Sequence, residues 1–215
     1  AGWAKTLAAR PREDALRRVD GKPSRSVPPP PDVRAVVRAE NARIASVRDS
    51  DRGAVLFLGE WIRPADGPVT GVYGSQRILN GEPRQPHYGI DFAGPVGTPV
   101  IAPAPGVVGL VEDDMYYTGG TLVLDHGQGL TSAFLHMSKV EAKPGETVTR
   151  GQRIGAIGAT GRATGPHLDW RINWFDRRID PASHLRVEGR HQPTGPHLVD
   201  DRRRQGTQQI GRAHV

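Results

Sequence analysis

Two hydrophobic patterns divide the chain. From about Asp32 to Arg48, apolar residues recur every three or four positions among charged ones, which predicts one amphipathic helix. From Ala54 onward, short runs rich in Val, Ile, Leu and Thr alternate with Gly, Pro and Asp, as is typical of strands joined by tight turns. The runs are Ala54–Leu58, Pro99–Ala102, Gly106–Glu112, Gly120–His126, Leu130–Met137, Thr147–Ile157 and His167–Trp174. Since no helical pattern interrupts them, we predict an all-β domain after a helical segment.

Three segments follow from these patterns. Residues 1–52 hold the helix and a proline-rich stretch, Pro23–Pro31, and are expected to form a linker or stalk. Residues 53–184 form the predicted domain. Residues 185–215 lack apolar periodicity and are expected to be an unstructured tail. The tail ends in IGRAHV, which resembles the translation of a common sequencing adapter. We therefore expect a replaced C-terminus and assign its histidines no function.

The net charge of +6 lies outside the predicted domain. Residues 1–52 hold 12 Lys/Arg against 7 Asp/Glu, residues 53–184 hold 11 against 13, and residues 185–215 hold 6 against 3. The domain thus has a net charge of −2, and no nucleic-acid partner is expected. No apolar run reaches the ~18 residues of a membrane span. Because Ala1 is not a start methionine, we expect a signal peptide or anchor upstream.

The first candidate metal-binding cluster is His87-Tyr88-Gly89-Ile90-Asp91. The chain has no cysteine, so a metal site must use His, Asp or Glu. Residues four apart on a straight strand lie ~13 Å from each other, whereas the ligands of one ion each approach it to ~2 Å. A shared ion therefore requires a bent backbone, and Gly89 is where a bend costs least. Alone, this spacing also arises by chance.

The second cluster lies on the predicted strand His167–Trp174. His167 and Asp169 alternate past Leu168 and should point to one face, with Leu168 and Trp170 facing the core. Burying such a polar pair is costly unless it has a partner. The alternative is a solvent-facing pair on an edge strand.

Two further histidines come from the central runs. His136 lies near the end of Leu130–Met137, where it could reach a cleft, although a lone histidine is more often structural. His126 belongs to an Asp-His-Gly turn signature and is predicted to be structural.

Taken together, three blocks of sequence resemble the M23 (LytM-type) metallopeptidases over about Gly53–His184. The blocks are HYGIDFAGPVGTPVIAPAPGVV, TLVLDHGQGLTSAFLHMS and GETVTRGQRIGAIGATGRATGPHLDWRI. Their order and spacing match the family, in its proteobacterial H-L-D-W variant. The resemblance implies a curved antiparallel sheet or two-layer sandwich with a groove, and hairpins like those of lipoyl-type carrier domains.

The resemblance also implies a metal site. His87 and Asp91 match the family's first pair of zinc ligands. The third ligand is the last position of an H-x-H motif, which is Asp169 here, where the family pattern has histidine. His136 and His167 match the residues near the activated water, one serving as base and the other stabilising developing charge.

The expected cofactor is one Zn²⁺. A His/Asp/Asp ligand set cancels the charge of the ion formally, whereas His/Asp/His leaves +1, so this centre should polarise water less. Carboxylate ligands also extend the choice of metal toward Mn or Mg.

The implied activity is that of a zinc metalloendopeptidase. Its substrate would be peptidoglycan, cleaved in the stem peptides or their cross-links, in the periplasm or cell envelope, where envelope proteins would be further partners. One alternative is a degenerate, non-catalytic M23 regulator that activates cell-wall amidases, but such relatives usually lose metal ligands. A carrier module is the other, but it needs a modifiable lysine at a hairpin tip. Lys139 and Lys143, the only lysines of residues 53–184, do not have that setting.

Overall fold

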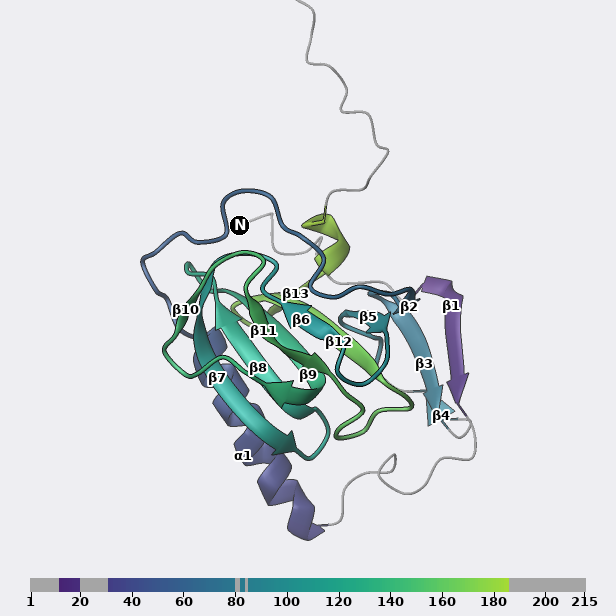
Figure 1. Ribbon diagram of the computed structural model, residues 1–215. Coiled ribbons are helices and arrows are strands. Elements are labelled where there is room, and N and C mark those ends of the chain that lie inside the picture. Colours follow the sequence, from purple (N-terminus) through teal and green to yellow (C-terminus); the bar gives the residue numbers. More distant parts are fainter. Residues whose placement is uncertain (1–11, 20–30, 80–81, 84, 186–215) are drawn as a thin grey trace, which may run out of the picture.

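The computed structural model describes residues 12–19, 31–79, 82–83 and 85–185 (Figure 1). One helix and thirteen strands are assigned in them. They are β1 (Arg12–Val19), α1 (Pro31–Arg48), β2 (Val69–Gly71), β3 (Ser75–Leu79), β4 (Glu82–Pro83), β5 (Ile90–Ala93), β6 (Pro99–Ile101), β7 (Gly106–Met115), β8 (Gly119–Asp125), β9 (Leu130–Val140), β10 (Thr147–Val148), β11 (Arg153–Ile157), β12 (His167–Trp174) and β13 (Arg177–Ile179). A 3₁₀ turn at Pro181–Ser183 follows.

A large antiparallel sheet holds most of these strands. Its order is β10-β7-β8-β9-β12-β5-β2, with β13 paired to β12. β11 pairs with both β9 and β6. β1, β3 and β4 form a separate small sheet. The predicted antiparallel all-β fold is therefore confirmed.

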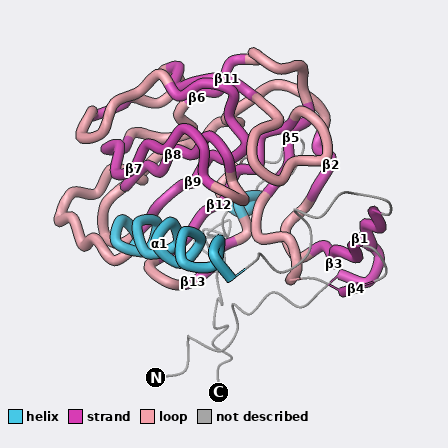
Figure 2. Tube along the Cα trace, turned by 90° about the horizontal axis from the view of Figure 1, so that it is seen from below, coloured by secondary structure: helices cyan, strands magenta, loops and turns pink. Residues whose placement is uncertain are grey.

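The alternation along β12 separates the two faces of the sheet. Leu168, Trp170 and Ile172 are fully buried on the face that holds the main hydrophobic core. Phe92 and Phe134, from the flanking strands, belong to the same core. In Figure 2, β6 and β11 lie together on one side of the central strands, and α1 lies on the opposite side. The polar residues of β12 therefore face the side on which α1 lies.

Helix α1 packs on that second face through a smaller apolar cluster. Val47 contacts the cluster formed by Val123, Ala133 and Leu135. Gly109 of β7 lies so close to Val47 that a β-carbon there would clash with it. The helix was predicted at about Asp32–Arg48 as part of a linker or stalk; it spans Pro31–Arg48 and packs on the sheet.

Some predictions about the strands are wrong. Residues 54–58 form no strand, because Leu56 makes a single backbone hydrogen bond with His126 and no ladder follows. The run Thr147–Ile157 is two strands, β10 and β11, separated by a turn. The edge-strand alternative for His167 and Asp169 is also wrong, since β12 lies between β9 and β5.

Two predicted segments fall outside the described residues. These are most of the proline-rich stretch Pro23–Pro31 and the tail from residue 186 onward. The three-segment division therefore stays a prediction.

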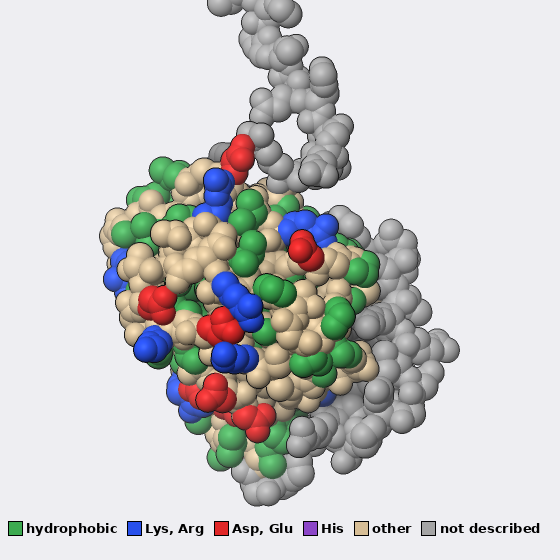
Figure 3. All heavy atoms as spheres, in the orientation of Figure 1, with side chains coloured by type: hydrophobic (Ala, Val, Ile, Leu, Met, Phe, Trp, Pro, Cys, Tyr) green, Lys and Arg blue, Asp and Glu red, His purple; other side chains and the backbone are tan. Residues whose placement is uncertain are grey.

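The face of the molecule in Figure 3 carries interspersed acidic and basic side chains with no large patch of one sign. Among the described helices, none has the length and hydropathy that a membrane span requires.

Candidate metal centre

Two buried carboxylates lie directly opposite each other in neighbouring strands. Asp91 of β5 pairs with Asp169 of β12 in the antiparallel register, and both residues are fully buried. Like charges at directly opposed positions destabilise a sheet. Burial increases that cost, so this arrangement calls for positive charge between the two side chains.

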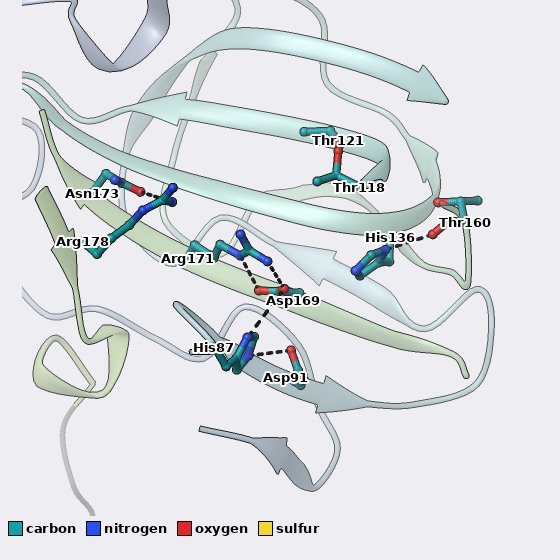
Figure 4. A network of polar contacts seen from close by, with 10 residues as sticks. All are labelled: His87, Asp91, Thr118, Thr121, His136, Thr160, Asp169, Arg171, Asn173 and Arg178. Carbon is teal, nitrogen blue, oxygen red and sulfur yellow. Dashed lines mark hydrogen bonds and ion pairs between the residues drawn. The ribbon is translucent and has the colours of Figure 1, made fainter. Parts of the chain in front are cut away.

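His87 completes the group from the segment before β5. Its Nε2 lies 2.9 Å from Asp91 Oδ1, and its Nδ1 lies 4.0 Å from Asp169 Oδ2 (Figure 4). The side chain is buried, with a relative exposure of 1%. The structure thus brings together the three residues that the sequence predicted as metal ligands.

Two glycines leave room for this approach. A β-carbon on Gly89 would clash with the carboxylate of Asp169 and with the carbonyl oxygen of Trp170. A β-carbon on Gly71 would clash with the carboxylate of Asp91. Gly89 has no positive φ, so the structure accounts for this glycine by close packing, and the expected bend stays a prediction. Sequence reasoning missed Gly71, which carries no pattern of its own.

The donor set fits a divalent ion. One ligand atom from each of His87, Asp91 and Asp169 lies within 4.8 Å of the others. Ligands that share one tetrahedral ion at ~2.1 Å lie ~3.4 Å apart, so small side-chain rotations suffice for a common ion. Nitrogen and oxygen donors of this kind suit Zn²⁺, and the two carboxylates also suit Mn²⁺.

Arg171 is a charged neighbour that sequence reasoning missed. Its Nε donates to Asp169 Oδ1 at 2.9 Å, and its Nη2 donates to Oδ2 at 2.6 Å. Alternation along β12 places positions 169 and 171 on one face, so the signal was present in the sequence. The guanidinium offsets one of the two carboxylate charges, and its fork restricts the orientation of Asp169.

His136 reaches this face through an irregularity in β9. Leu135 belongs to the cluster under α1, whereas Met137 belongs to the main core, so alternation breaks between them. Between Gly120 and Leu122 of β8, the paired residues of β9 are Met137 and Phe134, which leaves one extra residue in β9. His136 has a φ of 65°, in the left-handed region. It lies within β9, whereas the sequence predicted a place at the end of the strand.

The rings of His136 and His167 lie side by side, with centroids 4.8 Å apart. The Nδ1 atoms lie 2.9 Å from Thr160 O and 2.8 Å from Gly165 O, respectively. A carbonyl oxygen only accepts, so each neutral ring carries its proton on Nδ1 and keeps a lone pair on Nε2. The pKa of His136 is lowered to about 4, chiefly by burial, with the neighbouring His167 acting in the same direction and Asp169 acting against both. His136 is therefore neutral at pH 7.

His126, predicted to be structural, lies apart from these residues. It is fully buried against Trp61, with ring centroids 4.8 Å apart. Its Nδ1 donates to Pro105 O at 2.6 Å, and Ser132 Oγ lies 2.7 Å from Nε2. Both ring nitrogens thus have hydrogen-bond partners within the core.

Residues 85–181, which contain all five candidate residues, match the family model for Peptidase family M23. The chain carries an M23 peptidase domain. Part of the M23 domain is similar to two curated relatives. It is 47% identical over 87 residues to the peptidoglycan DD-endopeptidase ShyA of Vibrio cholerae, and 37% identical over 97 residues to the DD-carboxypeptidase/endopeptidase Mpg of Neisseria meningitidis. These matches cover 40% and 45% of the chain, which spans about a fifth of each relative's length, 20% and 22%.

Solved structures extend the similarity. A crystal structure from Pseudomonas aeruginosa described as peptidase M23 has a TM-score of 0.63 and 38% identity, over 72% of this chain and 63% of that one. A zinc-containing peptidase from Vibrio cholerae has a TM-score of 0.52 and 33% identity, over 64% of this chain and 41% of that one. The family and its fold are thereby established.

Proposed function

We propose that this M23 domain is a zinc-dependent endopeptidase that cleaves peptide bonds of peptidoglycan. The observation that carries the proposal is the convergence of His87, Asp91 and Asp169, from two neighbouring strands and the loop before one of them, on a space that one ion can fill. The relatives named as peptidoglycan endopeptidases support the substrate. Action on that polymer would take place in the cell envelope.

The residues of the site divide into proposed metal ligands and proposed proton-transfer groups. Zinc, when bound, supplies Lewis-acid polarisation of the scissile carbonyl and lowers the pKa of water. His87, Asp91 and Asp169 would hold it, and Arg171 would keep Asp169 in place. Arg171 also brings back one positive charge, which offsets the loss expected from aspartate at position 169.

His136 and His167 would move the protons. Each presents an Nε2 lone pair, because its Nδ1 proton is committed to a backbone carbonyl. One ring accepts a proton from the attacking water and returns it to the leaving amine. The other, once protonated, donates to the oxygen on which negative charge develops.

The direct test combines two measurements on the purified chain. Elemental analysis should give one zinc per chain, and mass spectrometry of digested peptidoglycan should show newly freed peptide ends. The His87→Ala variant should lose both. A metal-free wild-type protein that leaves peptidoglycan intact would refute the proposal and favour the regulator.

A further inference from the structure

A cavity of about 320 Å³ lies between α1 and the sheet, on the face that carries the metal ligands. It is lined by Asn41, Ile44, Arg48, Thr118, Ala133, Leu135, Arg171 and Arg178. Three of these eight side chains are arginines. Water reaches the cavity, because Asn41 is exposed and all three arginines are only half-buried.

The cavity has an excess of positive charge. Arg171 is paired with Asp169. The guanidinium of Arg178 has a long contact of 3.4 Å to Asn173 Oδ1 and lies over the ring of Tyr88, but it meets no carboxylate within the described part of the chain. Within the same described residues, no carboxylate forms an ion pair with the guanidinium of Arg48.

The surroundings of Arg48 make this excess costly. Burial and the charges of Arg178 and Arg171 lower the pKa of Arg48 to about 10, and the nearby Asp49 compensates only in part. Burial and Arg171 also lower the pKa of Arg178. A bound anion would relieve both the loss of hydration and the mutual repulsion.

The position of the cavity identifies the anion. Arg171 lines the cavity and also holds Asp169, so the cavity begins about one strand repeat, ~7 Å, from the metal group. A peptide bound there for cleavage carries its negative charge on carboxylates. A carboxylate also presents the paired oxygens that match a guanidinium fork.

We propose that Arg48, Arg171 and Arg178 form a subsite for a free carboxylate of the peptide substrate, next to the bond that is cleaved. This inference rests on the proposed function. Arg48 comes from α1, so the helix contributes directly to the substrate site. Peptides with a free carboxylate at this position should bind, and amidated ones should be disfavoured.

The test compares two ligands that differ only in this group. Binding of N-acetyl-D-alanyl-D-alanine and of its C-terminal amide is measured by calorimetry on the full chain, as purified and after chelation of metal. The wild-type protein should bind the acid at least about tenfold more tightly than the amide in both states. Arg48→Gln and Arg178→Gln should each reduce that preference severalfold.

Arg38→Gln is the matched control, because Arg38 is an exposed arginine of the same helix outside the cavity. It should keep the full preference. Equal affinities of the wild-type protein for the acid and the amide would overturn the proposal. So would a loss of this preference in Arg38→Gln as large as that in Arg48→Gln and Arg178→Gln. Inorganic phosphate that binds as tightly as the dipeptide acid would overturn the assignment to a peptide carboxylate.

The two proposals fail in different ways. If peptidoglycan is cleaved but acid and amide bind alike, only the subsite is refuted. If the Arg48-dependent preference is found in a protein that never cleaves peptidoglycan, the carboxylate-binding site stands, but its role beside a cleaved bond fails together with the enzymatic proposal. Circular dichroism of each variant shows whether it is folded, and removing the unpaired charge of Arg48 should not lower the melting temperature.

Discussion

At the scale of residues, Asp169 and Arg171 determine each other's effect. The two side chains form a bidentate ion pair on one face of β12. Histidine at position 169 would supply a nitrogen ligand but would leave Arg171 without its carboxylate. A substitution at one position therefore has to be interpreted with the other.

The first prediction concerns this pair. Asp169→His should still bind zinc, whereas Asp169→Asn should bind it at least about 100-fold more weakly, because its amide is a poor ligand. Adding Arg171→Gln to Asp169→His should strengthen zinc binding, since the unpaired guanidinium would repel the ion. Competition with a chromophoric chelator measures all three. Equal weakening in Asp169→His and Asp169→Asn would argue against position 169 as a ligand.

The second prediction separates holding the ion from proton transfer. His136→Ala should keep one zinc per chain and lose about 100-fold or more in turnover, the scale of general acid–base catalysis. Asp91→Ala should lose the metal as well as the activity. Metal analysis and digestion of peptidoglycan on the same preparations distinguish the two. Release of zinc from His136→Ala would show that His136 is a ligand.

At the scale of elements, the close contact of the segment before β5 with β12 depends on Gly89. The third prediction is that Gly89→Ala lowers the free energy of unfolding by about 1–3 kcal/mol, the cost of overpacking, and weakens zinc binding. Gly53→Ala is the control, because no atom lies within 4 Å of a β-carbon there. Denaturant unfolding of both variants gives the comparison. A fully stable Gly89→Ala protein that binds zinc normally would contradict the tight packing of Gly89 against Asp169.

Strand patterns predicted most of the sheet, because β7, β8, β9 and β12 are long and apolar on one or both faces. The shorter strands, such as β2 and β13, carry too few residues for a pattern. The sequence also could not predict that His136 lies on the face of the metal ligands, since the extra residue in β9 shows only in its pairing with β8. The candidate metal ligands came from the family resemblance, whereas Arg48 and Arg178 join the site only through tertiary packing.

At the scale of the whole molecule, two buried histidines make stability depend on pH. The pKa values of His126 and His136 are both lowered to about 4, mainly by burial. In the unfolded chain these two histidines take up protons near pH 6.5. The free energy of unfolding is therefore highest above that pH and falls as the pH decreases toward 4.

The fourth prediction follows from that difference. Each histidine should cost about 2 kcal/mol of unfolding free energy on going from pH 7 to pH 5. His126→Gln should be less stable at pH 7 but should lose only about half as much over the same interval. Denaturant titrations at the two pH values measure this. Parallel pH profiles for wild type and variant would exclude His126 as a source.

The fifth prediction concerns metal removal. The main core lies on the face of the sheet opposite the metal group, and the paired strands β5, β12 and β9 hold that group in place. Chelation should therefore abolish activity yet leave the far-ultraviolet circular dichroism unchanged, unlike small zinc domains that unfold without metal. Loss of the β-sheet spectrum on chelation would show that the ion is structural.

The double pairing of β12 has a practical consequence. Because ladders on both of its edges fix the spacing of Asp91 and Asp169, the backbone of the site should keep its geometry whether or not an ion is bound. Cobalt or manganese could then be loaded into folded protein by simple dialysis. The coordination sphere would thus become accessible to optical and magnetic spectroscopy, for which zinc itself is silent.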